Sequence, residues 1–284
     1  MISSSSILTF AGMIAIGLIL PVLVSAIWIK KTKQPIVTIL IGAAIFFGFA
    51  IILETIPKLL LFQTNNPVGR YVMNHVFLYM TIAALLAGIF EETGRLIAFK
   101  FLLKKETKKE TAVTYGIGHG GFEAMYLLVL GGIQNLMYAV MINTGQFDKV
   151  VEQIRVAAPE QLETIESIPS ALAAVGPSTL FLSGMERVSA MMIHIACSII
   201  MFWAVRGVHK MWLYVVAIVL HASIDMIAAL YQCGYITNLF VMELCLIAWA
   251  AAFLVITVRL IYNRIDTTEE KLQDEKPQEE ETTA

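Results

Sequence analysis

The chain has 284 residues, 58% of them hydrophobic and only 15% charged, and its mean hydropathy is +0.75. Long uncharged apolar runs with this composition exclude an ordinary soluble domain and indicate an integral membrane protein with no nucleic-acid partner. The formal net charge is −2, but eight acids and two lysines from residue 266 onward give the tail −6, so the rest of the chain carries +4. The three cysteines show no disulfide pattern.

Seven apolar segments are long enough to cross a bilayer of about 30 Å as helices. We expect them at residues 7–29, 36–62, 76–103, 112–142, 179–205, 212–233 and 239–262. The first has no basic region before it and no cleavage site after it, so it is interpreted as a retained span. The sequence therefore predicts an all-α, polytopic membrane helix bundle over residues 1–263. A disordered, acidic cytoplasmic tail is expected over residues 264–284.

Two connections between the spans are informative. Turn-forming residues predict a loop at 63–71. The polar segment 143–177 leaves the membrane, and its apolar residues recur at helical spacing, which predicts two short amphipathic helices broken at Pro159. This outer segment is interpreted either as a cap on the bilayer face or as a substrate gate.

The distribution of lysine and arginine predicts the orientation. These residues gather in the short loops after the first, third and fifth spans and at the exit from the seventh. The positive-inside rule places those loops and the tail in the cytoplasm and the amino terminus outside, an N-out/C-in topology. Glu54 and Lys58, near the outer end of the second span, are interpreted as interfacial anchors.

The third span carries two adjacent acids and a guanidinium near its centre: Glu91, Glu92 and Arg95. A charge there costs at least about 2.5–3.5 kcal/mol on insertion scales, so it normally faces a partner or a water-filled cavity. Arg95 is within helical reach of both acids. One arginine cannot neutralise two carboxylates, so a functional role is favoured over a structural ion pair.

Titratable residues on four spans fall at one depth near mid-membrane. At about 1.5 Å per residue from the cytoplasmic ends, the depths are roughly 20 Å for Glu91 and Glu123, 18 Å for His194, 17 Å for His221 and 22 Å for Asp225. Residues four or seven positions apart share a helix face. Such pairs are His119 with Glu123, His221 with Asp225, and Arg187 with His194. The sequence therefore predicts one polar site inside the bundle.

Next to this layer, the fourth span is almost bare of side chains. Gly116, Gly118, Gly120 and Gly121 precede Glu123. The glycines allow either close packing of helices or room for the backbone of a substrate. Glu186 and Arg187 lie nearer the outer surface, where an anchoring role is the simpler interpretation.

Acids and imidazoles in a dry site suit the activation of water. A carboxylate can take the proton as general base, and an imidazole N–H can stabilise the oxyanion of an attacked carbonyl. The same side chains could hold a metal ion; the candidate ligands are His119, Glu123, His194, His221 and Asp225. The chain has no HExxH motif, so spacing alone does not establish a metal site. A proton or ion pathway would use the same residue types.

Four stretches resemble the motifs of the PrsW-type and CPBP (CAAX-protease and bacteriocin-processing) intramembrane proteases. Glu91 to Arg95 (EETGR) resembles the motif EExxK/R, and residues 116–123 (GIGHGGFE) resemble GxGFxxxE. Arg187 to His194 resembles the third motif, and His221 to Asp225 (HASID) matches HxxxD/N. They occur in order over roughly residues 76–230. Within this superfamily the chain is most similar to the YhfC branch of membrane peptidases.

The resemblance implies a role for each matched residue. Glu91 would be the general base, supported by Glu92 and Arg95. Glu123 would hold the water, His221 and Asp225 would stabilise the oxyanion, and His194 would line the site. The residues expected to be catalytic are therefore Glu91, Glu92, Glu123, His194, His221 and Asp225. The spacing from the second acid to the arginine is that of PrsW. His119 replaces the phenylalanine of the second motif and adds an imidazole, which favours a metal site. The cofactor is therefore either absent or one zinc ion.

Two functions remain open from the sequence. The leading hypothesis is an endopeptidase of the bacterial plasma membrane, glutamic-type or metal-dependent, that cuts a membrane-associated protein or peptide. The alternative is a non-catalytic membrane protein, either a proton- or ion-coupled transporter or an immunity-type binding protein. Transporters often contain inverted repeats, and no internal repeat is evident here.

Overall fold

The computed structural model describes residues 1–63, 65–206 and 210–265. Within that part of the chain, seven helical segments are long and apolar enough to cross a membrane. They are Ser4–Thr32, Ile36–Leu61, Val76–Leu102, Glu110–Asn143, Pro177–Arg206, Trp212–Gln232 and Leu239–Arg264. The predicted all-α class and the seven spans are confirmed. Of the tail predicted at residues 264–284, residues 266–284 lie outside the described residues. The N-out/C-in orientation stays a prediction.

Several spans are single α-helices, and others contain irregular turns. The uninterrupted ones are α1 (Ser4–Thr32), α6 (Glu110–Asn143), α9 (Pro177–Arg206) and α10 (Trp212–Gln232). The second span is α2 (Ile36–Phe46), a π-helical stretch Phe47–Leu53 and α3 (Thr55–Leu61); the third is α5 (Val76–Ile97) followed by the π-helical Ala98–Leu102. The last is α11 (Leu239–Leu260), followed by the 3-10 turn Tyr262–Arg264.

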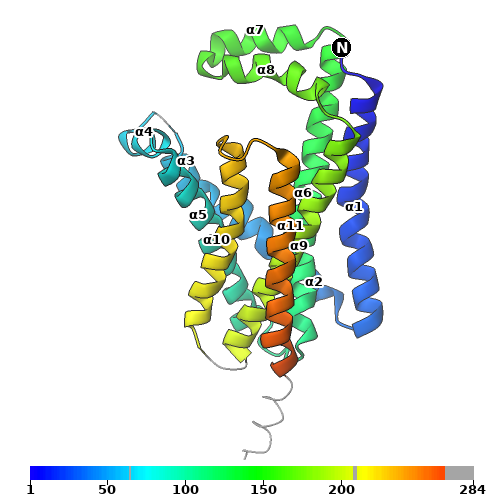
Figure 1. Cartoon of the computed structure of the whole chain (residues 1–284), viewed down its shortest axis with the longest axis vertical. Coiled ribbons are helices and arrows are strands. Elements are labelled where there is room, and N and C mark those ends of the chain that lie inside the picture. Colours follow the sequence, from blue (N-terminus) through cyan, green and yellow to red (C-terminus); the bar gives the residue numbers. More distant parts are fainter. Residues whose placement is uncertain (64, 207–209, 266–284) are drawn as a thin grey trace, which may run out of the picture.

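Helix α9 lies at the centre of the bundle. It packs against α6, α11, α10 and α1, while α6 also contacts α1 and α2, and α5 lies against α10 (Figure 1). Two-thirds of the most apolar part of α9 is buried, 67% against 17–39% for the other spans. Most of its middle therefore faces protein, and polar side chains on the buried faces meet other helices rather than lipid.

The glycines of α6 serve the packing of helices. A Cβ atom on Gly116 would lie 2.6 Å from the Cα of Ile195 in α9, and one on Gly118 would lie 2.2 Å from the carbonyl oxygen of Ile39 in α2. Both distances are too short for any side chain to fit without moving a backbone. Neighbouring helices occupy these faces, so the structure supports the packing interpretation and leaves no room there for a substrate backbone.

The outer segment between α6 and α9 forms a helical hairpin. Its parts are α7 (Phe147–Ala157), a 3-10 turn Pro159–Gln161 and α8 (Leu162–Ala173), so the predicted break at Pro159 is confirmed. Arg155 Nη2 donates to Glu166 Oε1 at 3.1 Å and joins the two helices. The hairpin lies at the end of the bundle that carries the amino terminus, opposite the end of α11 (Figure 1).

The loop predicted at 63–71 is wrong in its second half, where α4 (Pro67–Met73) begins. Asn66 caps this helix, with its Oδ1 accepting from the backbone N–H of Gly69 at 2.7 Å. Pro67 occupies the first turn, where a missing N–H costs nothing. The same residues that signal a turn therefore start a short helix.

Candidate active site

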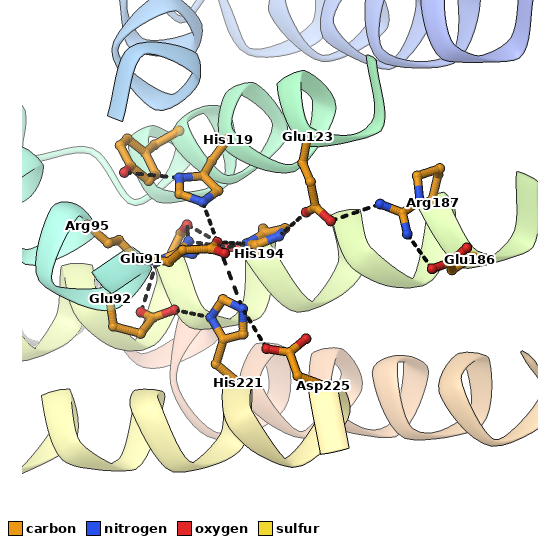
Figure 2. Close-up of polar contacts among 12 residues, drawn as sticks. Glu91, Glu92, Arg95, His119, Glu123, Glu186, Arg187, His194, His221 and Asp225 are labelled. Atoms are coloured by element: carbon orange, nitrogen blue, oxygen red, sulfur yellow. Dashed lines mark hydrogen bonds and ion pairs between the residues drawn. The ribbon is translucent and has the colours of Figure 1, made fainter. Parts of the chain in front are cut away.

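The polar residues of four helices meet inside the bundle, as the sequence predicts. Figure 2 shows α5, α6, α9 and α10 turning them toward one another. The linked residues are Glu91, Glu92, Arg95, His119, Glu123, Arg187, His194, His221 and Asp225. The equal-depth argument thus correctly identified a single cluster, drawn from helices far apart in the chain.

Glu91 occupies the centre of this cluster. Its Oε2 lies 2.9 Å from His119 Nε2 and 3.9 Å from both His194 Nδ1 and His221 Nε2. The side chain is buried, with 7% of the residue exposed. Three imidazoles from three helices therefore surround one carboxylate oxygen, and no guanidinium is paired with it among the described residues.

Arg95 is paired with the other acid of the motif. Its Nε lies 2.9 Å from Glu92 Oε2, and both side chains are fully buried. Its Nη1 donates to the carbonyl oxygen of His194 at 2.7 Å and to the hydroxyl of Ser198. The arginine thus compensates Glu92 and fastens α5 to α9, which leaves Glu91 as the uncompensated carboxylate.

The partners of the imidazoles indicate which nitrogen carries a proton. His221 Nδ1 lies 2.8 Å from Glu92 Oε1, so this nitrogen donates and Nε2 faces Glu91 and, at 3.7 Å, Asp225 Oδ2. His194 Nε2 donates to Glu123 Oε2 at 2.6 Å, and its Nδ1 accepts from Arg95 Nη2 at 3.1 Å. Buried acceptors therefore fix the orientation of both rings.

A cavity of about 370 Å³ reaches this cluster from one side. Five of the six residues expected to be catalytic line it: Glu91, Glu123, His194, His221 and Asp225. Glu92, expected among the catalytic residues, lies outside that lining, as do Arg95 and His119. Glu92 is placed to act through His221 rather than on a substrate, because its carboxylate is enclosed between Arg95 and that ring.

Charged residues that the sequence assigned to the interface also reach the cavity. Lys58 lines it and lies 2.7 Å from the buried Glu54, so the interpretation of this pair as interfacial anchors is incomplete. Arg187 bridges Glu123 at 2.9 Å and Glu186 at 2.5 Å, and both Arg187 and Glu186 line the cavity. The i, i+4 spacing of Glu54 and Lys58 indicates that the two side chains can pair, but it does not indicate that they lie at a cavity.

Three donor atoms of the cluster lie close enough together to hold a metal ion. Those of Glu91, His194 and His221 lie within 4.8 Å of one another, and a carboxylate with two imidazoles is a common zinc-binding set. Glu92 and Glu123 hold the other ring nitrogens, as outer-shell carboxylates do at metal sites. Arg95 at His194 Nδ1 opposes the fit, since a cation there would displace the guanidinium. The set fits a divalent ion if that contact is released.

A second group of donors is less suitable. Glu92, Cys197 and His221 also lie within 4.8 Å of one another, but neither Glu92 nor Cys197 lines the cavity. An ion bound there would have no access to a substrate. The first group is therefore the better metal site.

Comparisons with known proteins agree with this geometry. Residues 16–246 match the model of a family described as YhfC intramembrane metalloprotease. The chain is 29% identical over 269 residues to "Uncharacterized membrane protein YhfC" of Bacillus subtilis (strain 168), covering 92% of this chain and all of the relative. No solved structure gives a significant match. The matched region contains every residue of the site, and the chain belongs to the YhfC intramembrane metalloprotease family.

Proposed function

We propose that the protein is an intramembrane endopeptidase of the bacterial plasma membrane that hydrolyses a peptide bond in a membrane-associated protein or peptide. The observation that carries this proposal is Glu91, a carboxylate without an arginine partner among the described residues, at the wall of a cavity and surrounded by three imidazoles. The family description and the order of the motifs support it.

The cavity residues divide the chemistry among them. Glu91 receives the proton of the attacking water as general base, and Glu123, held by His194 and Arg187, orients that water. His221, with Nε2 facing the cavity, donates to the oxyanion when it is protonated, and Asp225 orients the ring. In a metal-dependent variant of the proposal, Glu91, His194 and His221 would instead hold a divalent ion, which when bound would supply the activation of water and the Lewis-acid polarisation of the peptide carbonyl.

The alternative of an ion-coupled transporter needs a polar path through the bundle. Beyond Arg95, however, the fully buried rings of Phe99, Tyr115 and Phe202 fill the space, with centroids 4.9 and 5.5 Å apart. These rings lie toward the end of the bundle where α11 finishes, away from Glu186 and Lys58. A transporter would have to open the bundle on this side by separating these packed rings, whereas hydrolysis needs access to Glu91 from one side only.

The proposal is tested by comparing membranes that contain the wild type or Glu91→Gln and labelling all new protein amino termini for mass spectrometry. We expect a set of cleaved membrane-associated peptides in the wild type that is absent in Glu91→Gln. Glu163→Gln, on the exposed surface of α8, is the matched control and keeps the wild-type set. The same cleavage products with Glu91→Gln would contradict the proposed role of this residue.

Metal content separates the two chemical variants of the proposal. The purified protein in mild detergent is analysed for zinc beside His221→Ala and Glu163→Gln. About one zinc per chain, lost only in His221→Ala, supports metal-assisted hydrolysis. An active preparation without metal supports water activated by Glu91 alone.

A further inference from the structure

A second cavity adjoins the active-site cavity and has no part in the proposed chemistry. It has a volume of about 190 Å³ and lies between α9, α10 and α11. Glu186, Ala228 and Gln232 line both cavities, so the two share a wall. We call it the acidic side cavity; its lining also includes Leu182, Ser183, Tyr231, Leu239, Met242 and Glu243.

The charged groups in this lining are both carboxylates, Glu186 and Glu243. Glu243 belongs to α11 and is 1% exposed, and its Oε2 has no hydrogen-bond partner within the described part of the chain. A buried carboxylate oxygen without a donor is costly, most of all in a membrane-spanning helix. Such a group points to a ligand that supplies the missing donor.

The nearby arginine is already engaged. Arg187 contacts Glu186 at 2.5 Å and Glu123 at 2.9 Å. Its single positive charge is therefore already paired with two carboxylates and is not available to compensate Glu243. Lys58, which lines the active-site cavity but not the side cavity, contacts Glu54. The side cavity is therefore lined by two acids and no basic side chain, and a cationic donor is the complementary ligand.

The rest of the lining suits a long side chain with a charged tip. Leu182, Leu239 and Met242 provide apolar contact for a methylene stem, and the carboxylates provide acceptors for its head group. Lysine and arginine side chains have this combination of an apolar stem and a cationic end. An acidic or purely aliphatic side chain would leave Glu243 without a donor.

We propose that the acidic side cavity is a specificity subsite for a lysine or arginine side chain of the substrate peptide; this inference rests on the proposed protease function. Glu186 and His194 are eight residues apart on α9, about 12 Å along the helix. An extended peptide covers that length in about four residues, at about 3.3–3.6 Å each. The basic residue therefore lies within about four positions of the bond at the active site.

The test measures binding separately from cleavage. The probes are two blocked, fluorescent decapeptides of alanine and leucine, one with a central lysine and the other with norleucine at that position. Both are titrated onto the full-length protein in detergent, as wild type and as Glu91→Gln. We expect the lysine peptide to bind about tenfold more tightly in both proteins, since a charge pair away from bulk water is worth at least that factor.

The variants assign this preference to the side cavity. Glu243→Gln keeps the shape and removes the charge, and we expect it to reduce the lysine preference to about twofold or less. Glu186→Gln should weaken the preference independently, which keeps the test valid if one variant fails to fold. Glu163→Gln, on the exposed face of α8, is the matched control and should keep the full preference.

The outcomes are distinct from those of the protease test. Loss of the preference in Glu243→Gln establishes the subsite even if no peptide is cleaved. Equal binding of the two peptides to the wild type overturns it, as does a preference that survives both Glu186→Gln and Glu243→Gln. A third peptide has norleucine and a free α-amino group, so its cation is the peptide amino terminus and not a side chain. Tighter binding of this peptide than of the lysine peptide also overturns the proposed subsite.

Discussion

At the scale of single residues, the site depends on how one arginine is shared between two acids. Arg95 is three positions after Glu92 and four after Glu91, so helical spacing allows either pair. The structure pairs Arg95 with Glu92 because its guanidinium is also held by the His194 carbonyl group and by Ser198. The ion pair thus holds His194 and His221 in place, and it leaves Glu91 without a guanidinium partner among the described residues, as its proposed role as general base requires.

We expect Arg95→Leu to destabilise the protein by about 3–5 kcal/mol, because it leaves the carboxylate of Glu92 buried without its counter-charge. The double variant Arg95→Leu, Glu92→Leu removes both charges and should recover a large part of that loss. It should remain inactive, because His221 Nδ1 then has no acceptor. Unfolding in a denaturing detergent series measures the stability, and a double variant no more stable than Arg95→Leu would disprove this account of the pair.

The sequence predicted which residues meet in one cluster better than it predicted the contacts that each of them makes. Equal depth on four spans correctly grouped residues such as Glu91 and His221. Neither depth nor spacing separates residues that line a cavity from residues behind them, so the sequence did not show that Glu92 lies behind His221. Lys58 was assigned to the interface because distance along a span does not show that a side chain reaches a cavity.

At the scale of helices, the glycines of α6 determine how closely the site residues approach. Gly118 is next to His119 and allows α2 to touch α6, and Gly116 does the same for α9 on another face. The sequence showed that this stretch was bare of side chains, but not which helices would cover it. Which helices cover it depends on the rotation of the span about its own axis. An almost uniformly apolar span has too few polar residues to indicate that rotation.

We expect Gly118→Ala to lower stability by about 1–3 kcal/mol and to reduce activity, because its Cβ would meet the carbonyl oxygen of Ile39 at 2.2 Å. Gly131→Ala is the matched control on the same helix, since nothing lies within 4 Å of its added Cβ. It should be neutral or slightly stabilising, because alanine is the better helix former. Melting temperatures of the two variants test this, and equal melting temperatures would show that α2 and α6 separate easily.

At the scale of the whole molecule, the orientation in the bilayer decides from which side a substrate reaches Glu91. The rings of Phe99, Tyr115 and Phe202 close the bundle toward the end of α11, whereas Glu186 and Lys58 lie on the side of the cavity nearer the outer hairpin. α4 and the hairpin lie toward the same end of the bundle (Figure 1). If the amino terminus is outside, the cavity faces the extracellular half of the membrane.

The basic loop between α5 and α6 gives a sharp test of that orientation. Its four lysines, Lys104, Lys105, Lys108 and Lys109, predict a cytoplasmic position, and the hairpin must then be extracellular because α6 crosses the membrane once. In a background with the native cysteines replaced, Glu163→Cys should react with an impermeant maleimide in intact cells. Glu106→Cys in the basic loop should react only after permeabilisation. The reverse pattern would place the hairpin in the cytoplasm, and the substrate would then have to enter the cavity from that compartment.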